Sequence, residues 1–347
     1  MTPSLKAARL FAAVAATALS ATLAIDHAKA EGNLTVYCSP QEEWCQLMVN
    51  EFQKATGITV AMTRKSSGET FAQIKAEAAN PKGDIWWGGT GDPHLQAAEE
   101  DLTLAYDSPM LKELNDWAVQ QHKTANGKTV GIYMGALGFG YSADVLKEKG
   151  VEGPKCWADL VKPEYKGEVQ VANPNSSGTA YTMVATLVQI MGEEEAFAYL
   201  KKLNENVNQY TKSGAAPSQA ASRGETLIGI TFQHDLVTPA VTAGVPMVVV
   251  SPCEGTGFEV GSMSIIKGAP NLENAKKWYD WALTPEAQAL GAQANAFQVP
   301  SNKNAPIPEA APKLSEIKLI DYDFAKYGSS EERKRLLSRW DKEIGAQ

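Results

Sequence analysis

The chain has 347 residues, of which 44% are hydrophobic and 21% charged, and its formal net charge at pH 7 is −8. This length is sufficient for a large buried core and for two domains. An acidic chain without a basic run argues against nucleic acid or an anionic membrane as its partner.

The first thirty residues have the pattern of a secretory signal peptide. Lys6 and Arg9 precede an Ala-rich apolar run at residues 10–25, which is short for a membrane-spanning helix. The segment ends in Ala28-Lys29-Ala30, the small-residue pattern of a cleavage site. We therefore expect export of the chain and removal of residues 1–30, with cleavage after Ala30.

From residue 33 onward, short apolar runs alternate with amphipathic segments. The first series predicts strands at residues 34–37, 58–62 and 84–87, with helices at 44–56 and 71–79 between them. The second series predicts strands at 169–172, 227–230 and 247–250, with helices at 181–191 and 193–204 among them. This alternation indicates an α/β fold with largely parallel sheet, in which ligands bind at the carboxyl ends of the strands.

The four cysteines all follow the signal segment. An even number of cysteines in an exported chain indicates disulfides. We favour the pair Cys38–Cys45, which brackets a short loop, and the pair Cys156–Cys253. No C-x-x-C occurs, and the three histidines of the mature chain are scattered, so we expect no metal site.

Four turns rich in Ser, Thr and Gly lie where strands give way to helices. Such turns bring hydroxyl and backbone N–H donors to a helix N-terminus, which favours an anion. Each hydroxyl can equally be an ordinary helix N-cap, but four such turns together favour a phosphate site. The candidate residues are Ser66, Ser67, Gly68, Thr90, Gly91, Ser176, Ser177, Gly178, Thr179, Ser213 and Gly214.

Motifs of nucleotide-binding and hydrolytic enzymes are missing or incomplete. The sequence has neither a G-x-x-x-x-G-K-[ST] loop nor a G-x-S-x-G elbow. Residues 138–143 match G-x-G-x-x-[GA], but the expected strand, helix and acidic residue do not follow in order. We interpret that segment as a strand that crosses between two lobes.

Polar side chains also gather after the strand at residues 227–230. His234 and Asp235 are neighbours, which seldom suits a catalytic triad, so we expect them to bind ligand hydroxyls or a ligand amine. Glu254 and Glu259 lie near a Gly-rich turn further along the chain. We expect at least one of these two carboxylates to face a ligand.

Together these features resemble a periplasmic solute-binding protein of an ABC transporter. The resemblance rests on the exported start, Ile85-Trp86-Trp87-Gly88-Gly89, Pro174-x-x-Ser177-Gly178-Thr179, Glu254-Gly255 and Leu283-Thr284-Pro285-Glu286-Ala287-Gln288. It implies the type II periplasmic-binding-protein fold, an α/β fold of two lobes joined by crossing strands around a ligand cleft. Residues 31–133 and 263–304 would form lobe 1, residues 134–262 lobe 2, and residues 305–347 a helical segment packed across both.

Within that family the chain is similar to the ferric-binding branch but lacks the adjacent tyrosine pair typical of ferric binders. It looks more like the sub-branch that binds hexose 6-phosphates such as glucose 6-phosphate. The resemblance implies that the hydroxyl turns hold phosphate through neutral donors, while His234, Asp235 and one glutamate hold sugar hydroxyls. The choice between Glu254 and Glu259 stays open, and spacing from Asp235 favours Glu259.

The resemblance also implies a binding protein rather than an enzyme, without a cofactor, that works as a monomer with an inner-membrane permease. Two alternatives keep the same fold. One is 2-aminoethylphosphonate, whose amine would pair with Asp235 or a glutamate. The other is ferric ion, which would be held by Tyr133, Tyr141, Tyr181 or Tyr210.

Overall fold

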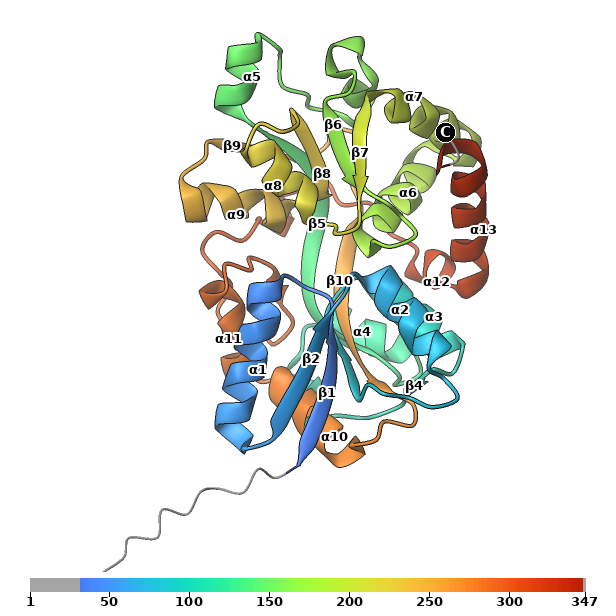
Figure 1. Ribbon diagram of the computed structural model, residues 1–347, viewed down its shortest axis with the longest axis vertical. Coiled ribbons are helices and arrows are strands. Elements are labelled where there is room, and N and C mark those ends of the chain that lie inside the picture. The colour runs from blue at the N-terminus through green and yellow to red at the C-terminus, as the bar shows by residue number, and fades with distance from the viewer. Residues whose placement is uncertain (1–31, 346–347) are drawn as a thin grey trace, which may run out of the picture.

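The computed structural model describes residues 32–345, so the predicted signal peptide and its cleavage site lie outside the described residues. Two α/β lobes lie one above the other, and two long strands run through both (Figure 1). Among residues 32–345, no helix combines the length and the apolar character needed to span a membrane.

Each lobe contains a set of parallel strands. In the first lobe β1 (Asn33–Cys38) pairs with β2 (Thr59–Arg64) and β3 (Ile85–Trp87). In the second lobe β6 (Val169–Ala172) pairs with β7 (Val207–Thr211) and β8 (Ile228–Phe232). These parallel pairs agree with the prediction from the alternating pattern.

The strands that connect the lobes are antiparallel, which corrects the expectation of a largely parallel sheet. β5 (Val130–Ser142) pairs with β10 (Phe258–Ile266) in one lobe, and with β8 and β9 (Met247–Val250) in the other. The short strands β4 (Thr103–Leu104) and β11 (Val299–Pro300) add to β10 and β5. The segment that matches a dinucleotide motif is therefore part of a crossing strand, as predicted.

The helices cover both sets of strands. They are α1 (Glu42–Thr56), α2 (Ser67–Ala76), α3 (Gly91–Glu99), α4 (Asp116–Thr124), α5 (Ala143–Lys149), α6 (Gly178–Met191), α7 (Glu193–Asn206), α8 (Ala216–Ser222), α9 (Gln233–Ala243), α10 (Leu272–Ala282), α11 (Pro285–Gln293), α12 (Phe324–Tyr327) and α13 (Ser330–Trp340). Local chemistry sets several ends: α1 stops at Gly57, whose φ of 72° favours glycine, and the Ser177 hydroxyl caps α6 by accepting from Ala180 N.

Each lobe has its own hydrophobic core. Phe52, Ile85 and Trp278 belong to the core beneath β1–β3, whereas Phe139 and Trp157 belong to the core around β6 and β8. Two separate cores joined by β5 and β10 place the lobe interface at the carboxyl ends of the parallel strands, where α/β folds bind ligands.

The C-terminal helix α13 contacts both lobes. Arg335 and Arg339 form ion pairs of 2.7–2.8 Å with Glu193 at the start of α7. Ser330 N donates to Glu99 Oε2 of α3 at 2.7 Å. Figure 1 shows α13 beside α7, with α12 leading toward the lobe interface.

Both disulfides that the sequence predicts are present. Cys38 is bonded to Cys45, and Cys156 is bonded to Cys253. The first pair joins the end of β1 to the first turn of α1, within one lobe.

Candidate functional site

A small cavity lies between the lobes, at the carboxyl ends of the parallel strands. Its lining comes mainly from the turns after β1, β2, β3, β6, β7 and β8 and from the crossing strands. Of the residues predicted from the sequence, it brings together Ser66, Ser67, Thr90, Ser177, Gly178, Thr179, Gly214, His234, Asp235 and Glu259.

One part of the lining consists of hydrogen-bond donors at strand-to-helix turns. We call it the donor set, and its members are Arg64, Ser66, Ser67, Thr90, Ser177 and Thr179. Ser66, Thr90 and Ser177 are the N-cap residues of α2, α3 and α6, so three helix N-termini meet at the cavity. Backbone N–H groups and partial positive charge at helix N-termini favour an anion.

The lobes touch across the donor set. Ser66 Oγ donates to Lys212 O at 3.0 Å, and Gly68 N donates to Ser176 O, also at 3.0 Å. Thr90 Oγ1 lies so close to Gly178 that a Cβ there would overlap it. The structure therefore describes lobes that are closed around the cavity.

Four of the predicted turn residues support the lining without belonging to it. Gly68 and Ser176 make the contact between lobes just described, and Gly91 begins α3. Ser213 Oγ accepts from Arg64 Nη2 at 3.4 Å. These residues stand next to the cavity and hold its edges together.

Arg64 also lines the cavity, a cation that the sequence prediction of neutral donors did not include. It is the last residue of β2 and is half-buried. Its position directly before the Lys65-Ser66-Ser67-Gly68 turn was the available sequence signal, since a cation next to an anion-binding turn is a natural partner for phosphate.

A second part of the lining consists of buried acids, amides and an imidazole. We call it the carboxylate set, and its members are Gln41, His234, Asp235, Glu259 and Gln298. Asp235 Oδ1 accepts from Gln41 Nε2 at 2.6 Å, which is another contact between the lobes. His234 Nε2 lies 3.8 Å from both Asp235 Oδ2 and Glu259 Oε1.

Burial decides the protonation of this set. Desolvation, reinforced by the Asp235 and Asp92 charges, raises the pKa of Glu259 well above its ordinary value. Desolvation lowers the pKa of His234, and Asp235 opposes this effect without reversing it. Both shifts favour the uncharged form of these two side chains.

Some polar atoms of the lining have no hydrogen-bond partner among the described residues. They are Thr90 Oγ1 in the donor set, and His234 Nδ1 and Gln298 Oε1 in the carboxylate set. Buried polar groups are nearly always paired in folded proteins. Orphaned atoms in both sets are therefore what a polar ligand or water in the cavity would satisfy.

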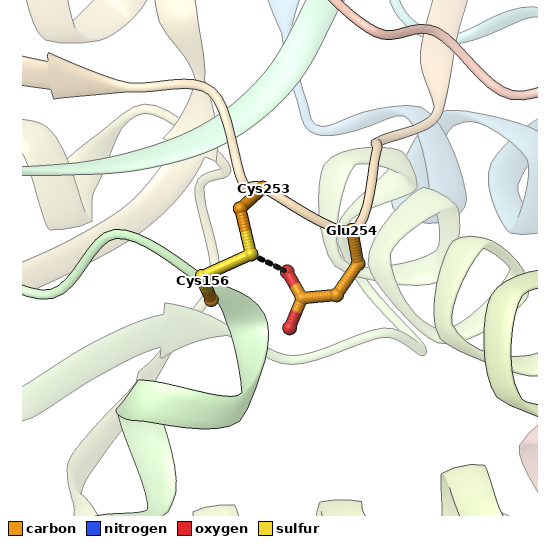
Figure 2. A group of neighbouring side chains, drawn as sticks. All are labelled: Cys156, Cys253 and Glu254. Carbon is orange, nitrogen blue, oxygen red and sulfur yellow. Dashed lines mark hydrogen bonds between the residues drawn. A yellow bond between two sulfur atoms is a disulfide. The ribbon is translucent and has the colours of Figure 1, made fainter.

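Glu254 lies outside the cavity, which corrects its place among the candidate ligands. Its carboxylate accepts from Trp157 N at 2.8 Å and from Ala158 N at 2.9 Å, at the first turn of a 3-10 helix. Figure 2 shows it beside the Cys156–Cys253 disulfide. Because both sulfur atoms are bonded to each other, this trio offers no thiolate to a metal.

Of the four tyrosines considered for iron, Tyr133 is the one that lines the described cavity. Its phenol oxygen accepts from Gly89 N at 2.7 Å, and desolvation raises its pKa well above the ordinary value. The hydroxyls of Tyr181 and Tyr210 are bonded instead to Tyr327 O and to Asn204 Oδ1. Of these four tyrosines the cavity thus offers one, and its raised pKa disfavours the tyrosinate form that would bind a ferric ion.

Comparisons with known proteins agree with this architecture. Residues 81–327 match the family described as bacterial extracellular solute-binding protein. An uncharacterized protein of Haemophilus influenzae is 45% identical over 334 residues, which are 95% of this chain and 96% of that protein. A candidate 2-aminoethylphosphonate-binding periplasmic protein of Salmonella typhimurium is 26% identical over 270 residues, 75% of this chain and 76% of that protein.

Among solved structures, the periplasmic binding protein AfuA of Actinobacillus pleuropneumoniae, with exogenous fructose 6-phosphate bound, is 44% identical. The superposition has a TM-score of 0.87 and covers 91% of this chain and 100% of AfuA. Iron-bound HitA of Pseudomonas aeruginosa is 20% identical with a TM-score of 0.74, covering 88% of this chain and 98% of HitA. This second likeness concerns the fold alone.

Proposed function

The chain belongs to the bacterial extracellular solute-binding protein family, and from that premise we propose that it captures a phosphorylated sugar between its lobes. It is a periplasmic solute-binding protein of an ABC transporter and not an enzyme, and it has the periplasmic-binding-protein fold that the sequence predicts. The proposed ligand is a hexose 6-phosphate, such as glucose 6-phosphate or fructose 6-phosphate.

The observation that carries the proposal is the pairing of two chemistries in one cavity. The donor set offers a guanidinium, hydroxyls and three helix N-termini, a combination that suits a phosphate dianion. The carboxylate set offers groups that both donate and accept, which suits sugar hydroxyls. The fructose 6-phosphate in AfuA, whose chain is 44% identical, supports the same ligand class.

An aminoalkyl phosphonate is the second candidate, because a Salmonella typhimurium relative bears that name and because acids line the cavity. An ammonium group, however, needs ionised carboxylates. The raised pKa of Glu259 favours its neutral form, which hydrogen-bonds a hydroxyl better than it stabilises a cation. Of the two carboxylates in the set, Glu259 therefore suits a sugar hydroxyl better than an ammonium group.

The test is a titration of the mature, ligand-stripped protein by calorimetry and thermal shift. The ligands are glucose 6-phosphate, fructose 6-phosphate, fructose, 2-aminoethylphosphonate, inorganic phosphate and ferric citrate. We expect the sugar phosphates to raise Tm by on the order of 5 °C at a hundredfold excess over Kd. A response to the phosphonate or to iron with none to the sugar phosphates would overturn the proposed ligand.

We further propose that the mature chain begins after Ala30, is a monomer, and delivers its ligand to an inner-membrane permease. Lobe closure supports the delivery step, because a permease can distinguish the closed, loaded form from the open one. Mass spectrometry of the periplasmic protein checks the cleavage site, and light scattering checks the monomer. Loss of sugar-phosphate uptake on deletion of the neighbouring permease checks the delivery step.

A further inference from the structure

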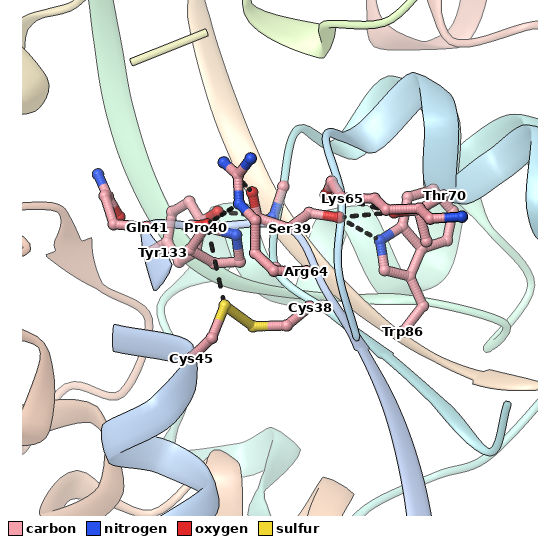
Figure 3. Close-up of a disulfide and its surroundings, with 12 residues drawn as sticks. Cys38, Ser39, Pro40, Gln41, Cys45, Arg64, Lys65, Thr70, Trp86 and Tyr133 are labelled. Carbon is pink, nitrogen blue, oxygen red and sulfur yellow. Dashed lines mark hydrogen bonds between the residues drawn. A yellow bond between two sulfur atoms is a disulfide. The ribbon is translucent and has the colours of Figure 1, made fainter. Parts of the chain in front are cut away.

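The Cys38–Cys45 disulfide closes a loop that enters the ligand cavity. Both cysteines are buried, and the three residues that follow Cys38, namely Ser39, Pro40 and Gln41, all line the cavity. On its inner side the loop is fixed by Trp86, whose indole Nε1 donates to Ser39 Oγ at 2.9 Å. Figure 3 shows the disulfide on one side of this loop and the Arg64 guanidinium on the other.

Arg64 is held by the backbone of that loop. Cys38 and Arg64 are direct partners in the register of β1 and β2, so the loop begins beside the arginine. Arg64 Nε donates to Pro40 O at 2.9 Å, and Nη2 donates to Ser39 O at 3.5 Å. With Nε and Nη2 engaged in this way, the guanidinium has a defined direction and Nη1 remains for an anion.

The same loop reaches the carboxylate set. Gln41 stands at the N-cap of α1, where its side-chain Nε2 donates to Asp235 Oδ1 at 2.6 Å across the lobe interface. Gln298 Nε2 donates to Gln41 Oε1 at 3.4 Å. One short loop therefore positions a cation of the donor set and an amide of the carboxylate set.

We propose that the Cys38–Cys45 disulfide is a positioning element of the ligand site, which fixes the loop that aims Arg64 at the anionic group of the ligand. The proposal rests on the proposed function, since it concerns how that site receives a phosphate. Without the cross-link the loop would sample more conformations, and ligand binding would have to order it. Pre-ordering a binding loop raises affinity by removing that cost.

The second disulfide provides a matched control. Cys156 and Cys253 are 97 residues apart and sit beside Glu254, outside the cavity lining. Removing either disulfide loosens the unfolded chain and lowers stability. Only the Cys38–Cys45 pair is tied to Arg64 through hydrogen bonds of its own loop.

A double-mutant cycle tests the proposal with calorimetric Kd values for fructose 6-phosphate. We expect Cys38→Ala/Cys45→Ala to weaken binding about tenfold, while Cys156→Ala/Cys253→Ala lowers Tm and changes Kd by less than about twofold. Arg64→Ala should cost about a hundredfold in the native background but less than about tenfold without Cys38–Cys45, because the guanidinium is already misdirected. Thr179→Ala, on the other lobe, should cost the same in both backgrounds.

Equal costs of Arg64→Ala in the two backgrounds would overturn the positioning role, because general destabilisation does not couple to one side chain. If Cys38→Ala/Cys45→Ala fails to fold, Pro40→Gly loosens the same loop with the disulfide intact. A smaller cost of Arg64→Ala in the Pro40→Gly background than in the native one supports the proposal, and an equal cost overturns it. Failure of the native protein to bind fructose 6-phosphate would instead overturn the proposed function.

Discussion

The donor set and the carboxylate set share one cavity but are built in different ways. The donor set stands at turns where strands pass into helices, and its charge comes from the half-buried Arg64. The acids and the imidazole of the carboxylate set are almost completely buried, with His234, Asp235 and Glu259 between 3% and 7% exposed. Its two clearly shifted pKa values, those of His234 and Glu259, both favour the neutral form.

This difference suggests a division of labour between affinity and selectivity. Charge-assisted hydrogen bonds from Arg64 to a phosphate are among the stronger polar contacts in proteins. Buried neutral groups contribute less attraction, but they penalise a ligand that leaves them unpaired. We expect changes in the donor set to weaken every phosphorylated ligand, and changes in the carboxylate set to alter the preference among them.

The largest expected effect is that of Arg64→Ala. Loss of a partly desolvated charge contact costs about 2–4 kcal/mol, or roughly 30- to 1,000-fold in Kd for fructose 6-phosphate. Lys65→Ala is the matched control, because Lys65 is the adjacent cation but its ammonium bonds Gln73 Oε1 outside the cavity lining. Calorimetry checks both, and an Arg64→Ala protein that binds within threefold of the native one would contradict the role of the donor set.

Gly68→Ala tests closure, on which both sets depend. A Cβ at this position would meet the carbonyl oxygens of Asn175 and Ser176, which belong to the backbone of the other lobe. Gly68 lies in the first turn of α2, where alanine is a better helix former than glycine. We therefore expect the ligand-free protein to keep its Tm or gain slightly, while affinity for fructose 6-phosphate falls roughly 10- to 100-fold.

An unchanged or higher Tm together with weaker ligand binding distinguishes blocked closure from general destabilisation. Glu69→Ala, in the same turn but outside the cavity lining, should leave both Kd and Tm close to native. A Gly68→Ala protein with native affinity would show that the lobes do not close as tightly as the structure describes.

Asp235→Asn examines the carboxylate set. The two carboxylate oxygens accept from Gln41 Nε2 and from the Thr231 hydroxyl, and the substitution keeps the shape but turns one of them into an NH₂ donor. Because we propose that Asp235 also accepts from sugar hydroxyls, we expect roughly 10-fold weaker binding of hexose phosphates and almost no change for inorganic phosphate. Glu254→Gln is the control, and a comparable loss in that variant would contradict the division into two sets.

Much of the donor set could be predicted because it depends on local sequence. Ser66, Thr90 and Ser177 sit where an apolar run meets a helical pattern, and that position alone makes them helix caps. Arg64 was missed because its role comes from the neighbouring β1, whose loop carbonyls hold it. The sequence around a residue does not show which residues of another strand will contact it.

The fold shows the same limit. Apolar runs predicted the strands at residues 169–172 and 247–250 correctly, yet an apolar run reads the same whether its partner is parallel or antiparallel. The choice between Glu254 and Glu259 also needed the structure, because β10 turns Glu259 inward while Glu254 caps a 3-10 helix. Spacing along the chain favoured Glu259, the glutamate that lines the cavity, without giving the reason.

The smallest expected effect concerns the protonation of the carboxylate set. Because burial raises the folded-state pKa of Glu259, the folded protein holds a proton that the unfolded chain releases above about pH 4.5. The contribution of Glu259 to stability is therefore complete below that pH and is lost as pH rises toward its raised pKa. Glu259→Gln should remove this decline, measured as Tm of the ligand-free protein between pH 4 and 8.

Asp92→Asn provides the comparison, because Asp92 is a second buried carboxyl, in the first turn of α3 and outside the cavity lining. Desolvation raises the pKa of Asp92 to about 6, although the Arg333 charge opposes it, so its decline falls between about pH 4 and pH 6. That shift corresponds to roughly 3 kcal/mol of pH-dependent stability. Asp92→Asn should flatten the Tm curve only up to about pH 6, whereas Glu259→Gln flattens it from pH 4.5 upward. Identical curves for Glu259→Gln and the native protein would mean that Glu259 is ionised in the folded state, and the carboxylate set would then suit an ammonium group better than a sugar hydroxyl.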